Sequence, residues 1–512
     1  MNRTLVFAAL VGACLVPAAV RAAIDAPVRL DTGLISGASG RSPDVRVFKG
    51  VPFAAPPVGP LRWKAPQPAA HWDGVRKVDR FSAMCPQATR VGPAAGLPTS
   101  VGLGDPSEDC LYLNVWTAAK SSVERRPVMF WIHGGGFTSG SGKALVFDGE
   151  ELAKKGVVLV TINYRVGIFG FFAHPELTQE SGRQASGNYG LMDMIAALEW
   201  VQTNIASFGG DPMRVTIFGQ SAGSGAVADL MGAPRAKALF HRAIGESGGF
   251  GLTPMRTLSQ AEQNGLRVAQ TVGALSIAEL RARSMADMLK VGSAGGPDVD
   301  GWVLPADVNT TFREGKQNDV PVLIGSNADE GNVLARPISR DMYRKQIKER
   351  YGELADAYLK LYPADTEEHA KSSQIVNSSD TMAWQMRNWA GLQARTGKSK
   401  VFFYYFTRQA PSDAPFQGAY HDAELYYAFH NLHLYKQQWK EWDNKLADTI
   451  SSYWVNFAFK GDPNGKDLPA WAAYGDKRTD GVMVFGDEET MGSGRLGRAK
   501  QELFDAYVAA QK

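Results

Sequence analysis

The chain is poor in cysteine, in unbalanced charge and in repeated sequence. Three cysteines occur in 512 residues, and no cluster of Cys, His and acidic residues has the spacing of metal ligands, so no metal site is predicted. The 55 basic and 52 acidic residues give a formal net charge of +3, with no long run of either sign. Nucleic acid and anionic membranes are therefore not expected as partners.

Internal repeats, low-complexity tracts and interdomain linkers are also absent from the sequence. A hydrophobic share of 44% and a charged share of 21% are typical of a well-packed globular protein. Because large α/β folds can run well beyond the usual domain length, we expect residues 23–512 to form a single domain.

The N-terminus differs from the rest of the chain. Residues 1–22 hold a basic residue near the start, an apolar run from Leu5 to Val16 and small residues up to Ala22. This pattern predicts a secretory signal peptide cleaved after Ala22, and hence a secreted or periplasmic protein. A membrane anchor is the rival interpretation, but it would need a longer apolar run, so no stable membrane insertion is expected.

Two of the three cysteines, Cys85 and Cys110, lie in the predicted mature chain. An even pair of cysteines in an exported protein indicates a disulfide, and two free buried thiols are the alternative. Cys14 follows the residues VGA, which loosely match a lipoprotein cleavage box, so lipidation at Cys14 is a further alternative.

Short apolar runs rich in β-branched and aromatic residues alternate with helical patterns along the chain. Runs of this kind predict strands buried on both faces, as in parallel or mixed sheets covered by helices: 127–135, 157–165, 214–219, 320–325 and 400–406. Amphipathic helices ended by glycine are predicted at 190–210 and 446–461. The alternation predicts one α/β domain, in which the polar, helical stretch 255–400 forms a cap over the sheet.

The pattern Gly-x-Ser-x-Gly, which marks the nucleophile turn of many serine hydrolases, occurs twice, at Ser221 and Ser247. The chemistry needs a serine between a strand and a helix, because the N–H groups and dipole of the helix start stabilise a developing oxyanion. The strand predicted at 214–219 precedes Ser221, and small residues able to start a helix follow it. Glycines and a proline follow Ser247 instead, so Ser221 is the predicted nucleophile.

An oxyanion hole is predicted from three glycines, Gly134 to Gly136, that directly follow a predicted strand. Backbone without side chains can turn its N–H groups toward a ligand, and this motif supplies half of the oxyanion hole in lipases and esterases. We assign the donors to the backbone of Gly135, Gly136 and Ala222. Taken alone, three glycines can also form an ordinary turn.

An acid and a general base should follow the serine, in the order serine, acid, histidine. Five histidines follow Ser221: His241, His369, His421, His430 and His433. His421 is the predicted base, because it lies in a loop after the strand predicted at 400–406. The acid is Asp329 or Glu330, two neighbours in a loop after another predicted strand, and the sequence pattern alone does not choose between them.

Several motifs closely resemble the type-B carboxylesterases, a family that includes cholinesterases and bacterial para-nitrobenzyl esterases: 48–66, 108–116, 163–171, 208–223 and 461–464. The resemblance covers essentially the whole mature chain. It implies an α/β-hydrolase fold with a central, mostly parallel sheet, flanking helices, cap insertions and no cofactor. It also implies Glu330 as the acid, since the family has a glutamate before glycine in this loop.

The resemblance further implies two structural ion pairs, Arg62 with Glu108 and Arg165 with Asp193. One position departs from the family near the predicted base, because Asp422 stands directly after the histidine where glycine is commoner. This departure can change the turn of that loop.

Two other departures narrow the predicted substrate. Cholinesterases carry a tryptophan platform for choline between their first two cysteines, whereas residues 86–109 contain no aromatic residue. They also have a glutamate just before the nucleophile, whereas this chain has the uncharged Gln220. A quaternary ammonium would lose its main attractions here. We therefore expect a small-molecule ester substrate that is uncharged or at least not a choline ester, and the sequence leaves the oligomeric state open.

The predicted reaction is a two-step acyl transfer from an ester. The rival from another class is a non-catalytic, neuroligin-like binding module, and a third interpretation keeps the enzyme but makes its substrate an amide, carbamate or lipid. The second serine, Ser247, should end the strand beside the nucleophile turn. We expect it to be a buried hydroxyl, hydrogen-bonded near His421 or the backbone of that turn.

Overall fold

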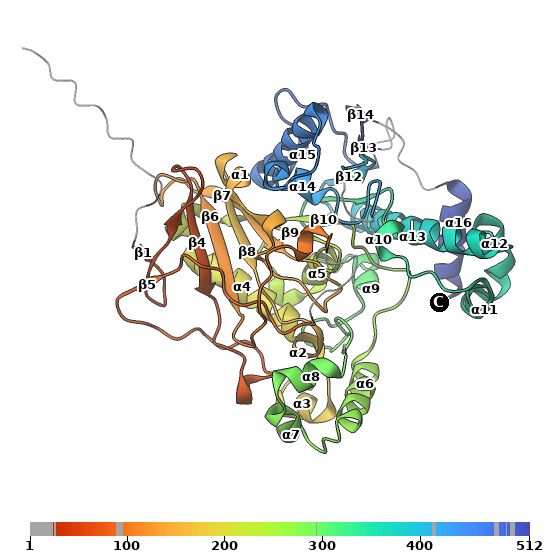
Figure 1. The fold of residues 1–512 in the computed structure, drawn as a ribbon, viewed down its shortest axis with the longest axis horizontal. Coiled ribbons are helices and arrows are strands. Elements are labelled where there is room, and N and C mark those ends of the chain that lie inside the picture. The colour runs from red at the N-terminus through yellow and green to blue at the C-terminus, as the bar shows by residue number, and fades with distance from the viewer. Residues whose placement is uncertain are drawn as a thin grey trace, which may run out of the picture.

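The computed structural model describes residues 24, 27–88, 96–292, 294–411, 416–475, 481–487, 489–491 and 497–511. The predicted signal peptide at 1–22, which includes Cys14, lies outside the described residues. The described chain folds around one large twisted sheet that helices cover (Figure 1).

Eleven described strands form this sheet, in the order β14-β13-β12-β11-β10-β9-β7-β8-β6-β4-β3. All neighbours from β13 to β8 run parallel, and antiparallel pairs complete both edges. The strands span Ala38–Ser39 (β3), Arg46–Pro52 (β4), Tyr112–Thr117 (β6), Arg126–Ile132 (β7), Val158–Ile162 (β8), Gly210–Gln220 (β9), Arg242–Glu246 (β10), Val322–Asn327 (β11), Val401–Phe406 (β12), Val482–Phe485 (β13) and Glu489–Met491 (β14). A three-stranded sheet joins β1 (Val28–Arg29), β2 (Leu34–Ser36) and β5 (Val75–Lys77).

Each of the five predicted strands corresponds to a strand in the parallel part of the large sheet. All residues of β8 and β11 are buried. Their side chains alternate between two hydrophobic cores on opposite faces: Val158 and Val160 pack in one core, and Leu159 packs in the other. The near-continuous apolar runs in the sequence therefore follow from a sheet that is covered on both faces.

The two predicted amphipathic helices are present, and glycine ends both. α4 spans Tyr189–Asn204 and continues as a 3₁₀ turn up to Gly209, while α15 spans Glu441–Lys460 and ends at Gly461. The two glycines have φ angles of 77° and 70°, left-handed values that favour glycine at a helix end. Both helices contact β9, and they contribute to the two different cores.

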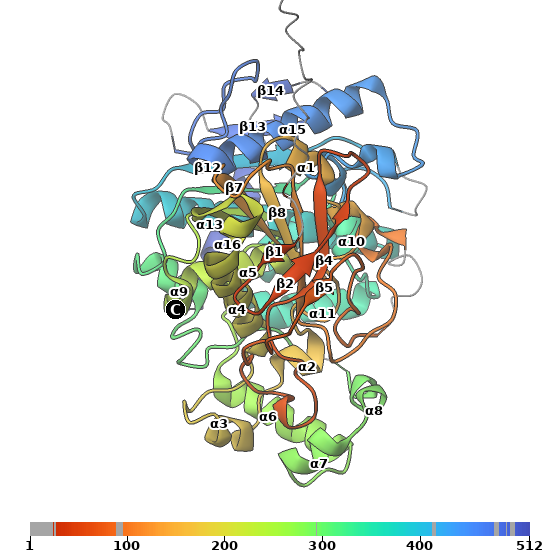
Figure 2. The same ribbon diagram turned by 90° about the vertical axis from the view of Figure 1, so that its left-hand side faces the viewer.

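The remaining helices form the outer layers and two groups at the ends of the molecule. α3, α6, α7 and α8 gather at one end, and α11, α12 and α16 at another (Figures 1 and 2). The bounds are Glu150–Lys154 (α1), Gly167–Phe171 (α2), Pro175–Glu180 (α3), Ala222–Gly232 (α5), Leu258–Thr271 (α6), Ile277–Ala282 (α7), Met285–Lys290 (α8), Val308–Arg313 (α9), Gly331–Leu334 (α10), Arg340–Tyr351 (α11), Ala355–Leu361 (α12), Glu367–Thr396 (α13), Leu425–Ala428 (α14) and Arg498–Ala510 (α16).

The structure differs from the prediction for 255–400, which is not one continuous cap. β11 interrupts the stretch, and the long helix α13 packs against β11 and β12 as a layer of the main sheet. Trp389 and Leu392 of α13 are buried in the same core as α4. The mostly polar composition of the stretch concealed this helix. Its buried apolar side chains belong to two different cores, with Trp389 in one and Trp384 in the other, so no single apolar stripe marks the helix in the sequence.

Candidate active site

Ser221 occupies a sharp turn between β9 and α5. Its φ of 58° and ψ of −126° lie outside the ordinary regions for a residue with a side chain, and its N–H donates to Glu246 O at 2.8 Å. The flanking glycines make the turn possible: a Cβ on Gly219 would lie 2.6 Å from Gly223 C, and one on Gly223 would lie 2.1 Å from Ile132 O. The predicted strand-turn-helix setting of Ser221 is therefore present.

Ser247 lies in a different setting, as predicted, at the end of β10 with no helix following directly. Its φ is 53°, its N–H donates to Gly325 O at 2.9 Å, and its side chain is fully buried. The predicted hydrogen bond of its hydroxyl is wrong: among the described residues Ser247 Oγ has no hydrogen-bond partner. The nearby carbonyl of Gly248 accepts from Ser224 Oγ instead, at 2.7 Å.

His421 and Glu330 come from loops that follow β12 and β11, and the structure brings them into contact. His421 Nδ1 lies 2.5 Å from Glu330 Oε2, and both residues are buried. Glu330 Oε1 accepts from the backbone N–H of Asn327 at 2.8 Å, which fixes the carboxylate. Beside a carboxylate Nδ1 must carry the proton, so Nε2 is the nitrogen with the lone pair.

The alternative acid, Asp329, has a different partner. Its Oδ2 accepts from the backbone N–H of Ala419 at 2.8 Å, on the loop that leads to His421. Asp329 thus fastens the histidine loop, and Glu330 contacts the imidazole. Of the two neighbouring carboxylates, the geometry pairs Glu330 with His421.

The glycine run after β7 lies against the Ser221 turn. Gly135 and Gly136 have φ angles of 109° and 64°, which residues with side chains rarely adopt. A Cβ on Gly134 would lie 2.7 Å from Gln220 O, so the two segments pack backbone to backbone. Ala222, the third predicted donor, is the first residue of α5 and directly follows Ser221.

Ser221, His421, Gly135 and Gly136 line one cavity of about 580 Å³. A cavity of this size holds a drug-sized molecule. Of its other wall residues, only Gln220 and Asp422 stand out in the sequence; the rest are Leu97, Thr99, Asn332, Val333, Leu334, Arg336 and Phe416. The residues from Asn332 to Arg336 follow Glu330 after one glycine, and this closeness is the one signal in the sequence that could have indicated them.

Two further buried acids lie behind Glu330. Burial raises the pKa of Glu246 to about 8, although Trp454 Nε1 donates to its carboxyl at 2.8 Å. Burial, together with the negative charges of Glu246 and Glu330, raises the pKa of Glu424 well above its usual range. Both shifts favour the protonated, neutral form of the carboxyl, and that form adds no negative charge beside the His421–Glu330 pair.

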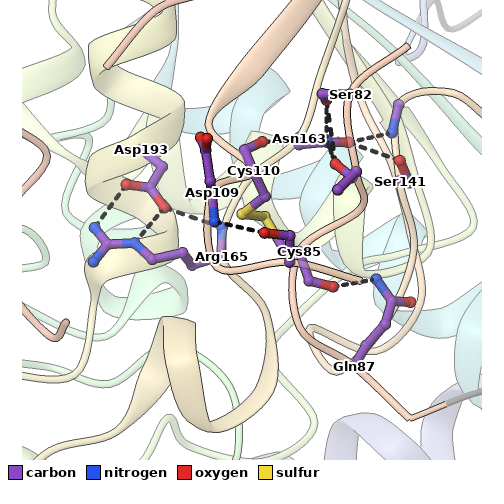
Figure 3. The surroundings of a disulfide bond; sticks show 12 residues. Ser82, Cys85, Gln87, Asp109, Cys110, Ser141, Asn163, Arg165 and Asp193 are labelled. Carbon is purple, nitrogen blue, oxygen red and sulfur yellow. Dashed lines mark hydrogen bonds and ion pairs between the residues drawn. A yellow bond between two sulfur atoms is a disulfide. The ribbon is translucent and has the colours of Figure 1, made fainter. Parts of the chain in front are cut away.

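The predicted disulfide is present between Cys85 and Cys110, with an S–S distance of 2.07 Å. Figure 3 shows Gln87 at one end of it, where Gln87 Nε2 donates to Cys85 O at 3.0 Å. At the other end Asn163 Nδ2 donates to Cys110 O at 3.2 Å. Gln87 also exchanges two hydrogen bonds of 2.7 Å with the backbone of Gly140. The loop that the disulfide closes carries Leu97 and Thr99 to the wall of the cavity.

Both ion pairs implied by the family resemblance are also present. Arg62 Nε donates to Glu108 at 2.7 Å, and Arg165 donates to both oxygens of Asp193 through Nε and Nη2, at 2.8 and 2.7 Å. Figure 3 shows the second pair beside the disulfide. Because Arg165 and Asp193 are almost fully buried, this pair fastens the segment after β8 to α4.

Metal-ligand clusters and membrane-spanning helices are both absent from the described part of the chain. Its His, Cys, Asp and Glu side chains form no group of three that could hold a metal ion. None of its helices combines the length and the apolar character needed to cross a membrane.

Comparison with known proteins gives a consistent assignment. The sequence profile described as "Carboxylesterase family" matches residues 25–505. Fumonisin B1 esterase of Sphingopyxis macrogoltabida is 37% identical over 517 aligned positions, which cover 95% of this chain and 91% of that protein. Para-nitrobenzyl esterase of Bacillus subtilis is 34% identical, with 90% and 95% covered.

A solved structure of PNB esterase has the same fold. It superposes with a TM-score of 0.81 at 32% sequence identity, over 93% of this chain and 99% of that chain. The predicted α/β-hydrolase fold is thereby confirmed. The chain belongs to the carboxylesterase family and is a carboxylic ester hydrolase.

Proposed function

We propose that the protein is an exported serine esterase that hydrolyses small organic esters through Ser221, His421 and Glu330. The observation that carries this proposal is the 2.5 Å contact between His421 Nδ1 and Glu330, at a cavity whose wall also contains the Ser221 turn. The proposed reaction uses only side-chain and backbone groups of the protein.

The reaction follows from this arrangement in two steps. His421 Nε2 takes the proton of Ser221 Oγ as that oxygen attacks the ester carbonyl, and Glu330 stabilises the imidazolium that forms. Backbone N–H groups of Gly135, Gly136 and Ala222 stabilise the oxyanion. His421 then protonates the departing alcohol, and in the second step it activates the water that releases the acid.

The cavity wall supports small, largely apolar esters as substrates. Leu97, Val333, Leu334 and Phe416 supply apolar surface, and about 580 Å³ accommodates a molecule with an acyl and an alcohol part. No aromatic residue occurs in the disulfide loop 86–109, so a tryptophan platform for choline is missing there. The 37% identity to a fumonisin B1 esterase makes fumonisin B1 a specific candidate to include in substrate panels.

Export is proposed from the sequence pattern of residues 1–22. The described part of the fold starts directly after it: Ile24 is buried, and its N–H donates to Ala119 O at 3.0 Å. A cleavage after Ala22 would leave this contact intact. The Cys85–Cys110 disulfide supports the same proposal, because disulfides persist in oxidising compartments.

Covalent labelling tests the proposed nucleophile. Diethyl p-nitrophenyl phosphate should inactivate the protein, release one equivalent of p-nitrophenol and leave a diethylphosphoryl group on Ser221. Trypsin separates the two Gly-x-Ser-x-Gly serines, because Ser221 falls on peptide 215–235 and Ser247 on peptide 243–256. A label on peptide 243–256 would overturn the assignment.

A substrate panel tests the reaction class beside this labelling. We expect turnover of p-nitrophenyl butyrate, and much slower turnover of butyrylthiocholine and p-nitroacetanilide. Absence of both hydrolysis and labelling would instead favour a binding module. Faster cleavage of the anilide than of the ester would make the natural substrate an amide.

Reduction of the disulfide should weaken both the fold and the site. The bond joins residues 25 positions apart, and on the chain-entropy model such a loop contributes about 3 kcal/mol to the free energy of unfolding. Since Leu97 and Thr99 lie in this loop and line the cavity, KM for p-nitrophenyl butyrate should rise several-fold. Urea unfolding and kinetics with and without dithiothreitol measure both effects. The double variant Cys85→Ser/Cys110→Ser should have the KM and stability of the reduced protein, and dithiothreitol should not change them. An unchanged KM in both the reduced protein and the double variant would contradict the prediction.

A further inference from the structure

Two residues that the sequence singles out are in direct contact: Gln220 differs from the cholinesterases, and Asp422 differs from the commoner glycine of the family. Gln220 precedes the nucleophile turn and Asp422 follows His421, 202 positions later in the chain. Gln220 Nε2 donates to Asp422 Oδ1 at 3.2 Å and to the carbonyl oxygen of His421 at 2.7 Å. One amide group therefore bridges the carboxylate of residue 422 and the backbone that carries the histidine.

The second oxygen of Asp422 is also held. Thr99 Oγ1, on the disulfide loop, donates to Asp422 Oδ2 at 2.8 Å. Asp422 is 3% exposed and lines the cavity beside Ser221 and His421. Both donors are neutral, and among the described residues no Lys, Arg or His forms an ion pair with Asp422, so its negative charge is not neutralised by them.

Together, the two positions exchange the places of a carboxylate and an uncharged residue. A cholinesterase-like chain with glutamate at the position of Gln220 and glycine at that of Asp422 would have a carboxylate on the nucleophile strand and none on the histidine loop. This chain has the amide on the strand and the carboxylate on the loop. In both arrangements a negative charge lies at the contact between the nucleophile strand and the histidine loop. The two arrangements differ in which of these segments carries the charged residue.

We propose that Asp422, oriented by Gln220 and Thr99, is a positioning residue that stabilises the charged form of His421 in addition to the Glu330 contact. This inference rests on the proposed catalytic roles of Ser221 and His421. An anion near the imidazole favours the proton that His421 takes from Ser221, so it lowers the barrier to acyl transfer. It also explains why an uncharged Gln220 is compatible with catalysis.

Several ionisable side chains bear on the same imidazole and must be considered with Asp422. Glu330 contacts it directly, burial raises the pKa of both Glu246 and Glu424, and Arg336 lines the same cavity. Substitution at 220 or 422 leaves the identity of these groups unchanged. The negative charge of Asp422 is one of those that raise the pKa of Glu424, so the double variant, which keeps a carboxylate at this contact, is the control for an indirect effect through Glu424.

The pH dependence of kcat/KM gives the sign of the effect. The free enzyme needs neutral His421 to accept the proton of Ser221, so the acid limb of the profile follows the pKa of His421. A nearby carboxylate raises that pKa, typically by about one unit or more at 4–6 Å. Asp422→Asn should therefore move the acid limb to lower pH by about one unit and lower plateau kcat by about tenfold.

The matched variants exchange the charge without changing the number of side-chain atoms. Gln220→Glu alone places two carboxylates in contact and should move the acid limb to higher pH. In the double variant Gln220→Glu/Asp422→Asn, the new amide at position 422 can donate to the new carboxylate at position 220, while the amide oxygen accepts from Thr99. The double variant should return the acid limb to within about 0.3 units of the wild type and restore most of kcat.

The three variants decide the proposal on pH profiles with p-nitrophenyl butyrate, after thermal unfolding shows that each is folded. Opposite shifts in the single variants and recovery in the double variant are the expected result. An acid limb that stays in place in Asp422→Asn, or a double variant that keeps the Asp422→Asn shift, overturns it. If Asp422→Asn does not fold, the proposal is overturned when the acid limb of Gln220→Glu does not move to higher pH. Loss of activity in Ser221→Ala alongside unmoved profiles would leave the proposed function standing and reject only the role of Asp422.

Discussion

Ser221→Ala is expected to lower kcat for p-nitrophenyl butyrate by roughly 10⁴- to 10⁶-fold, because it removes the hydroxyl that attacks the ester carbonyl. The residual rate would come from the oxyanion donors and substrate binding alone. The unfolding temperature should change by no more than about 2 °C, since alanine at φ 58° carries the same backbone strain as serine. Stopped-flow kinetics and calorimetry on the same preparation measure both quantities.

Ser247→Ala is the matched control for this prediction, because it removes the same hydroxyl from the second Gly-x-Ser-x-Gly. Ser247 Oγ is buried and has no hydrogen-bond partner among the described residues, so its removal breaks no bond there. We expect kcat to fall by less than about tenfold and the free energy of unfolding to change by at most about 1 kcal/mol. A folded Ser247→Ala variant as inactive as Ser221→Ala would show that the wrong serine was chosen.

The sheet could be predicted because its strands leave a strong signal. Strands such as β8 face two cores, so every position is apolar or buried and the run stands out between turn residues. Helix α13 left a weaker signal, because its sequence is mostly polar and its buried apolar side chains divide between two cores, with Trp389 in one and Trp384 in the other. Composition averaged over 255–400 therefore suggested a cap where the structure has a layer of the main domain.

Within the candidate site, too, some features have a local signal in the sequence and others have none. The setting of Ser221 is local, since a strand, two glycines and a helix start are adjacent in sequence. The contact between Gln220 and Asp422 joins segments 202 positions apart, and no local pattern indicates it. Ser247 shows the opposite limit: its burial follows from the position of β10, whereas the hydrogen bonding of one hydroxyl depends on side-chain geometry at the scale of an ångström.

Arg165→Met is expected to lower the free energy of unfolding by about 3–5 kcal/mol at neutral pH, because it leaves the carboxylate of Asp193 buried without its cation. Three N–H groups of Arg165 hold that carboxylate: the backbone N–H at 3.0 Å, Nε at 2.8 Å and Nη2 at 2.7 Å. Both side chains are almost fully buried, at 2% and 0% exposure, so water cannot replace the lost partner. Methionine keeps most of the side-chain volume, so the effect reports the charge rather than a cavity.

The dependence of this loss on pH identifies its cause. Burial raises the pKa of the Asp193 carboxyl, and the Arg165 guanidinium opposes that rise. Without the guanidinium the folded protein keeps a proton on Asp193 that the unfolded chain releases above about pH 4, so stability falls as pH increases. Urea unfolding of Arg165→Met should therefore show a larger loss at pH 8 than at pH 5, relative to the wild type at each pH.

The double variant Arg165→Met/Asp193→Leu removes both charges and should recover most of the lost stability at both pH values, since replacing a whole buried pair by apolar side chains is often neutral. A single variant that loses less than about 1 kcal/mol, or equally much at both pH values, would contradict the prediction. Recovery in the double variant would show that the pair is needed because each charge compensates the other. It would also explain why two charges join α4 to the segment that follows β8. Once either Arg165 or Asp193 is present, the folded state needs the other to compensate its buried charge.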